Sequence, residues 1–83
     1  MTLRALRVPR PATVEAGPDG APRAVDAGGG RRAVVAIRDD WLVQDLWWTA
    51  RPVERHYHEV VLEPGRVVLT FRDLVDGHWY VHG

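Results

Sequence analysis

Short runs of alternating apolar and polar residues cover most of this chain, and turn-forming residues separate them. A period of two is typical of β-strands, because successive side chains of a strand point to opposite faces of a sheet. Turn signals recur about every ten residues, which favours an antiparallel β fold. The segments expected to form strands are residues 11–16, 22–27, 33–38, 41–48, 53–63, 66–72 and 78–82.

Glycine, proline and aspartate separate these segments. Residues 17–20 and 76–77 contain the Asp-Gly pair that is typical of tight hairpins. Residues 28–30 form a flexible Gly-Gly-Gly segment. Asp39-Asp40 is expected to end the strand at residues 33–38. We therefore predict an all-β antiparallel domain over residues 11–83, preceded by a flexible tail at residues 1–10. Its expected form is a small meander or partly open barrel of five or six strands.

The segments at 53–63 and 66–72 are expected to form a hairpin around Pro64-Gly65, which fits the central positions of a type II turn. A type II turn has an unfavourable twist for a two-residue hairpin, so a longer loop is the alternative. The parity of apolar positions slips after Tyr57, which predicts a β-bulge near His58-Glu59 that keeps Tyr57 on the core side. A two-residue loop would pair Glu63 with Arg66, Leu62 with Val67, and Val60 with Leu69.

The core is expected to be small, because a chain of 83 residues buries only a little over ~60% of its unfolded surface. The few large apolar side chains should therefore form it. A helix over residues 41–48 would not gather an apolar stripe, so a strand is expected there too. The core candidates are Trp41, Val60, Leu62, Val67, Leu69, Phe71 and Trp79.

Composition excludes several classes of function. The chain has no cysteine, which excludes disulfides, thiolate metal sites and cysteine nucleophiles, and it has no serine nucleophile. No stretch free of arginine and acidic residues exceeds seven residues, whereas a membrane-spanning helix needs about 20 apolar residues. The first 11 residues also lack the apolar run of a secretory signal. We therefore expect a cytoplasmic protein that does not enter a membrane.

The formal net charge is zero, but charge is unevenly distributed along the chain. Residues 1–38 contain seven arginines and three acidic residues, and residues 39–83 contain four arginines and eight acidic residues. The two halves can attract each other within one fold or form faces for different partners. Arg31 and Arg32 are candidates for contacts with nucleic-acid phosphates, although the zero net charge argues against such binding.

Histidines raise the question of a metal site. His56 and His58 would share one face of a strand, because they are two residues apart. A zinc site needs three or four ligands, and His78 and His82 are expected too far away to complete one. We therefore expect no metal, no cofactor and no catalytic residues. A metal-dependent hydrolase using His56 and His58 is the last-ranked alternative.

The adjacent tryptophans Trp47 and Trp48 are the most specific feature of the sequence. On a strand they would point to opposite faces, so one ring can enter the core while the other lies outside. An exposed tryptophan is a typical anchor of a protein interface. Alternatively, a small barrel covers both faces, or a bulge turns both rings inward. Trp47, Trp48 and the neighbouring Arg51 are the candidate partner-binding residues.

A longer pattern of aromatic, arginine and glycine residues runs through the second half of the chain. It consists of Trp41, Trp47-Trp48, Arg51-Pro52-Val53, Arg55, Tyr57, Val60, Leu62, Gly65-Arg66, Phe71-Arg72-Asp73, Gly77 and Trp79-Tyr80. This pattern resembles a small bacterial domain family of unknown function. That family occurs standalone and at the C-terminal end of ImuB-type proteins, the Y-family-polymerase-like members of the bacterial mutasome.

The resemblance implies an accessory role in damage-tolerant DNA synthesis or repair, and it supplies no catalytic residues. With the candidate residues above, it predicts a non-catalytic interaction module that binds a protein partner through Trp47 or Trp48 and Arg51. The translesion polymerase machinery would be the source of that partner. The alternative is a domain that binds nucleic acid directly through Arg31, Arg32 and nearby aromatic residues.

Overall fold

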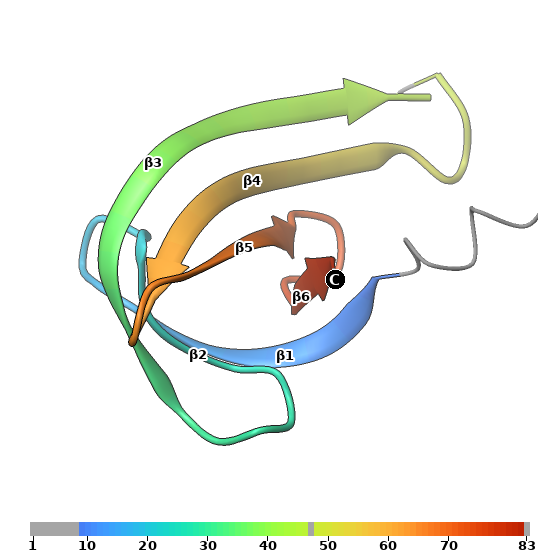
Figure 1. Cartoon of the computed structure of the whole chain (residues 1–83). Helices are drawn as coiled ribbons and strands as arrows, with labels where there is room; N and C mark the ends of the chain where they lie inside the picture. Colours follow the sequence, from blue (N-terminus) through green and yellow to red (C-terminus); the bar gives the residue numbers. More distant parts are fainter. Residues whose placement is uncertain (1–8, 47, 83) are drawn as a thin grey trace, which may run out of the picture.

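The computed structural model describes residues 9–46 and 48–82, in which it contains β-strands and no helix (Figure 1). The predicted all-β class is therefore confirmed. The first strand begins one residue earlier than expected, and the other turns fall close to the glycine and proline positions of the sequence. The strands are β1 (Arg10–Ala16), β2 (Pro22–Asp26), β3 (Arg32–Asp45), β4 (Val53–Leu62), β5 (Arg66–Asp73) and β6 (Trp79–His82).

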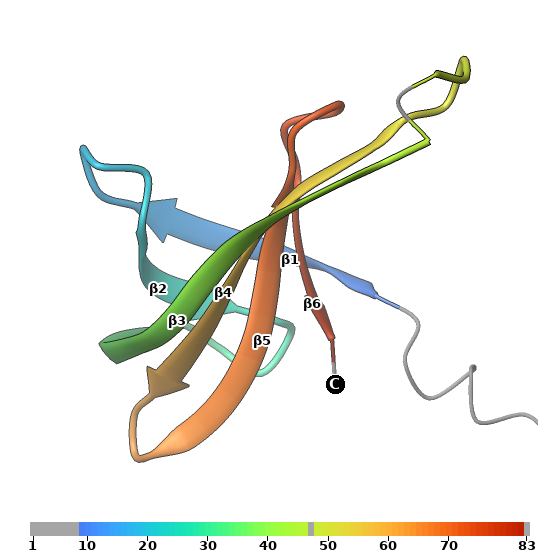
Figure 2. The ribbon, with the colours of Figure 1, turned by 90° about the horizontal axis from the view of Figure 1, so that it is seen from above.

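The strands form a meander in which each pairs antiparallel with the next one along the chain. Residues 10–12 of β1 also pair with residues 79–81 of β6, and this short ladder closes the sheet into a barrel. Figure 2 shows β1 and β6 beside each other on the side of the barrel where the chain ends. The predicted small barrel is thus confirmed, and it is closed.

β3 is one strand of 14 residues, not two short strands. The expected break at Asp39-Asp40 is wrong, because pairing with β4 continues through both residues. Asp39 lies opposite Glu59, and Asp40 lies opposite His58. The aspartates instead follow a β-bulge, in which β3 has one extra residue between Ile37 and Asp39.

A bulge was expected in β4 near His58-Glu59, but it lies in the neighbouring strand β3, opposite this part of β4. β4 pairs with β5 without interruption from Arg55 to Leu62. Along this part of its length β4 has a strand on each side, so a bulge there would disturb two ladders instead of one. Because β4 is regular, Tyr57 and Val60 point to opposite faces, and Tyr57 is not on the core side.

The hairpin between β4 and β5 has a three-residue loop, Glu63-Pro64-Gly65, with a cis bond between Glu63 and Pro64. Gly65 donates a hydrogen bond to the carbonyl of Leu62 at 2.6 Å and has a φ of 139°, which favours glycine. The longer loop was the open alternative, and the pairing expected from a two-residue loop is wrong. The observed partners are Leu62 with Arg66, Val61 with Val67, and Val60 with Val68.

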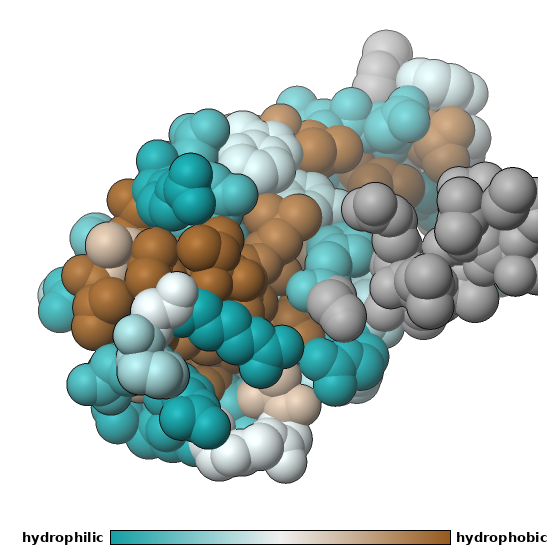
Figure 3. Space-filling view, in the orientation of Figure 1, coloured by the Kyte–Doolittle hydropathy of each residue, from teal (hydrophilic) through white to brown (hydrophobic). Residues whose placement is uncertain are grey.

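The barrel interior holds a core of short aliphatic side chains. Val25, Val60, Leu62 and Val81 are each at most 6% exposed and pack together. Val60 and Leu62 confirm the core prediction, whereas Val25 and Val81 come from strands too short to show a clear apolar period. Figure 3 shows apolar side chains gathered at the mouth of the barrel, with hydrophilic side chains around and across them.

A row of aromatic side chains covers the opposite face of the same sheet. Phe71 is buried there between Tyr57 and Tyr80, with ring centroids 4.9 Å and 5.2 Å away, and the guanidinium of Arg55 lies 4.5 Å from its ring centre. Trp41 stacks on Tyr57 at 5.5 Å. Aromatic pairs of this kind stabilise the sheet beyond the area they bury. The outer row is therefore a second place where apolar surface is removed from water.

Five of the seven expected core residues do not fill the barrel interior as predicted, and one of them, Phe71, is buried on the outer face instead. Trp41 and Val67 are 40% and 46% exposed, so the prediction is wrong for both. Leu69 and Trp79 are half-buried. The shift of the hairpin register by one residue explains Val67 and Leu69, because a one-residue slip moves each side chain to the other face.

We expect Phe71→Ala to lower the free energy of unfolding by about 3–5 kcal/mol, because it removes the centre of the aromatic row. Urea denaturation measures this loss. Val67→Ala on the same strand is the matched control, and its exposed side chain predicts a change within about 0.5 kcal/mol. Equal effects of the two substitutions would show that the outer row does not stabilise the fold.

Candidate functional site

The outer end of the β3–β4 hairpin projects beyond the other strands (Figures 1 and 2). We call this end, together with the adjoining residues of β3, the arm, defined as residues 41–46 and 48–54. β5 pairs with β4 only from Arg55 onward, so Val53 and Glu54 pair with β3 alone. The amide of Leu74, in the β5–β6 loop, donates a hydrogen bond to the carbonyl of Glu54 at 2.8 Å. This contact supports the base of the arm and leaves the outer part exposed.

The outer edge of β3 is open over most of its length. β2 pairs with β3 only at Arg32 and Ala33, so within the described chain residues 34–45 have a ladder partner on one side only. An edge strand presents unpaired backbone groups to which another chain can add a strand. Bulges and charged side chains, three of them aspartates, interrupt this edge and restrict which strand can pair with it.

Large apolar side chains lie exposed along the arm. Trp48 is 63% exposed and Leu42 is 62% exposed, while Trp41 and Leu46 are each 40% exposed. Single exposed apolar residues are common, but several on one projecting hairpin mark an interaction surface. The sequence left open which ring of the tryptophan pair would be exposed, and in the structure the ring of Trp48 is exposed. Trp47 lies outside the described residues.

Hydrogen bonds hold the loop at the tip of the arm. The amide and hydroxyl of Thr49 donate to the carbonyl of Leu46 at 3.0 Å and 2.8 Å, and the amide of Arg51 donates to the Thr49 hydroxyl at 3.1 Å. Leu46 has a φ of 51°, a left-handed conformation that is strained for a residue with a side chain. These contacts link Leu46, Thr49 and Arg51, and Arg51 is exposed at the same tip.

The two arginines predicted to contact nucleic acid have different surroundings. Arg31 makes a two-point ion pair with Glu15 of β1, at 2.5 Å and 3.1 Å. This hydrogen-bonded pair lowers the pKa of Glu15. Arg31 is therefore already matched with a carboxylate. Arg32 instead lines a cavity at the mouth of the barrel.

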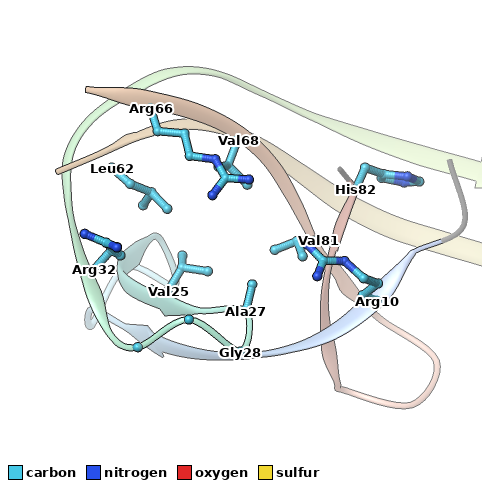
Figure 4. A pocket seen from close by; sticks show the side chains of 12 residues that line it. Arg10, Val25, Ala27, Gly28, Arg32, Leu62, Arg66, Val68, Val81 and His82 are labelled. Atoms are coloured by element: carbon cyan, nitrogen blue, oxygen red, sulfur yellow. The ribbon is translucent and has the colours of Figure 1, made fainter. Parts of the chain in front are cut away.

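That cavity has a volume of about 400 Å³ and combines an apolar floor with a basic rim. Arg10, Arg32 and Arg66 come from three different strands and surround it, and Figure 4 shows their side chains around Leu62, Val25 and Val81. No acidic residue lines it, and none of the three arginines makes an ion pair within the described part of the chain. The arrangement suits an anionic group attached to an apolar or planar body.

Barrel closure explains why the sequence did not reveal this cavity. Arg10 lies in a segment expected to be tail, and Arg66 was expected to pair with Glu63. Arg10 and Arg66 are the first residues of β1 and β5, so no local sequence pattern links them to Arg32. Only the closed meander brings the ends of β1, β3 and β5 to one mouth.

His56, His58 and Asp40 form a cluster on one face of β3 and β4. The rings of His56 and His58 have centroids 4.3 Å apart, and Nε2 of His56 lies 2.7 Å from Oδ2 of Asp40. His58 is only 4% exposed, and burial, followed by the charge of His56, lowers the pKa of its imidazole. The expected sharing of a face by the two histidines is confirmed by this contact. The aspartate was missed because Asp39-Asp40 was interpreted as a strand break.

Comparisons of the chain with protein-family models, with curated proteins and with solved structures give no match. The resemblance to the ImuB-associated domain family therefore stays a prediction. The described residues contain no helix long and apolar enough to cross a membrane.

We expect Trp48→Ala to change the free energy of unfolding by no more than about 0.5 kcal/mol, because the side chain is 63% exposed at the end of the arm. Urea denaturation followed by far-ultraviolet circular dichroism measures it. A loss of several kcal/mol, comparable with that of Phe71→Ala, would mean that Trp48 is a structural residue and would remove it as a binding candidate.

Proposed function

We propose that this chain is a non-catalytic interaction module that binds a protein partner through the arm. The observation that carries the proposal is the arm itself, a projecting hairpin with Trp48 exposed at its tip and an open β3 edge along its side. Tryptophan and arginine are the residues most enriched among interface anchors, and Trp48 and Arg51 share the same loop.

The fixed loop conformation supports this function. A binding surface that is already ordered loses less conformational entropy when a partner arrives. The hydrogen bonds that Thr49 makes with Leu46 and Arg51 restrain the tip, and Leu46 keeps a strained backbone conformation there. Strain of this kind is tolerated at sites where function depends on the conformation.

The chemistry of the arm indicates what its partner should present. Asp39, Asp40 and Asp45 give the β3 edge a negative charge that Arg38 only partly offsets. An added strand should therefore carry basic residues, together with an apolar pocket or patch for the tryptophan ring. We further propose that the partner belongs to the machinery of damage-tolerant DNA synthesis, and this part of the proposal rests on the resemblance alone.

Affinity capture from a lysate of the source organism tests the arm. We expect the wild-type chain to retain a specific partner after nuclease treatment, and Trp48→Ala to reduce its recovery at least tenfold, as loss of an interface anchor does. The matched control is Val67→Ala, which removes an exposed apolar side chain from β5, away from the arm.

Three outcomes of that capture would contradict the proposal in different ways. Recovery that disappears with nuclease would transfer the function to nucleic acid. Equal recovery by Trp48→Ala and wild type would remove the arm as the site. Partners unrelated to DNA synthesis would leave the arm in place and refute the link to damage tolerance.

The barrel mouth supports a second candidate function, direct binding of nucleic acid. The observation in its favour is the set of three arginines around an apolar cavity that no acidic residue lines (Figure 4). Arginines of this kind bind phosphate, and a base can occupy an apolar recess. Arg32 remains a candidate for phosphate contact if the barrel mouth binds nucleic acid, whereas Arg31 is engaged by Glu15.

Salt dependence tests the second function. If the mouth binds single-stranded DNA, affinity for a labelled oligonucleotide should fall as salt rises, with a log–log slope of about 0.7 for each phosphate contacted. Arg32→Gln and Arg66→Gln should each weaken binding and reduce the slope. Arg38→Gln is the matched control, because Arg38 pairs with Glu59 and does not line the cavity. Equal effects of all three substitutions would indicate general charge attraction and refute a site at the mouth.

A further inference from the structure

One potential ligand atom from each of Asp40, His56 and His58 lies within 4.8 Å of the other two. The pairing of β3 with β4 produces this arrangement, because Asp40 lies directly opposite His58 and His56 follows two residues along the same face. The cluster lies where the arm leaves the barrel. Among the described residues, no other group of three histidine or acidic side chains comes as close together.

His58 provides a second, independent observation. Its side chain is almost fully buried, and its Nδ1 makes no hydrogen bond with any described residue. A buried polar atom without a partner lowers the stability of a fold, and such an atom in a native structure calls for an explanation. A bound cation beside the ring provides one, because a neutral imidazole nitrogen donates a lone pair to a metal ion.

We propose that Asp40, His56 and His58 form a binding site for zinc at the base of the arm. Two imidazoles and one carboxylate are a ligand set that suits zinc and leaves a fourth position for water or a partner's side chain. Asp40 is exposed, so the open position is reached from solvent.

The side chains need only small movements to hold the ion. Tetrahedral zinc with bonds near 2.0–2.1 Å places its ligand atoms roughly 3.3 Å apart. The Asp40–His56 contact of 2.7 Å must open slightly, and the widest pair, within 4.8 Å, must close by at most about 1.5 Å. Rotations of the exposed Asp40 and half-buried His56 side chains cover this range, while packing fixes His58.

Metal titration of the full chain tests the site. After treatment with a chelator and its removal, we expect calorimetry with zinc to show saturable binding of one ion per chain. Cobalt(II) in place of zinc should give the visible absorption of a low-symmetry site with nitrogen and oxygen ligands. Asp40→Asn and His56→Gln should each weaken zinc binding at least tenfold. Asp40 is exposed and His56 is partly exposed, so these variants are expected to fold, which circular dichroism checks.

Two substitutions provide matched controls. Asp39→Asn alters the neighbouring aspartate, which lies on the opposite face of β3, and His78→Gln removes a histidine whose side chain is 74% exposed in the β5–β6 loop. Both should bind zinc like the wild type. Absence of saturable binding would overturn the proposal. Zinc binding by Asp40→Asn as tight as that of the wild type would also overturn the proposal, and so would an equal loss of zinc affinity in the two controls. Either result would show adventitious binding by surface histidines or acidic residues.

Discussion

The pairing of β3 with β4 is the interaction on which the functional features of this molecule depend. Its ten residue pairs run from the barrel wall out to the tip of the arm. One end carries Val60 and Leu62 into the core, and the other positions the loop that holds Trp48. Because β5 covers only part of β4 and β2 covers only the start of β3, the same ladder is a barrel wall at one end and a free hairpin at the other.

The second constraint is the small volume that six short strands can enclose. The interior is filled by valine, leucine and alanine side chains, so the large aromatic rings have little room inside. Tyr57, Phe71 and Tyr80 instead pack side by side on the outer face, with Trp41 stacked at the end of the row. Both faces of β4 and β5 thus contribute to stability, which explains how Phe71 is buried although it does not point into the barrel.

The strands and most of the turns could be predicted from the sequence, because they depend on local alternation and on glycine, proline and aspartate. The sequence could not predict on which face of the sheet each side chain lies, because this depends on the pairing register. A bulge or one extra loop residue moves the side chains that follow to the opposite face. Val67 and Trp41 were misplaced for this reason. The basic cavity was out of reach as well, because Arg10, Arg32 and Arg66 meet only when β1 pairs with β6.

The bulge between Ile37 and Asp39 links the misplaced tryptophan to the histidine cluster. Without the extra residue, Asp40 and Trp41 would exchange faces, so that Trp41 would point with Val60 and Asp40 would point outward. With the bulge, Asp40 lies beside His58 and Trp41 stacks on Tyr57. A single inserted residue therefore brings a carboxylate to two histidines and adds a ring to the outer aromatic row. The sequence feature first interpreted as a strand break is, in the folded chain, the residue pair that this bulge orients.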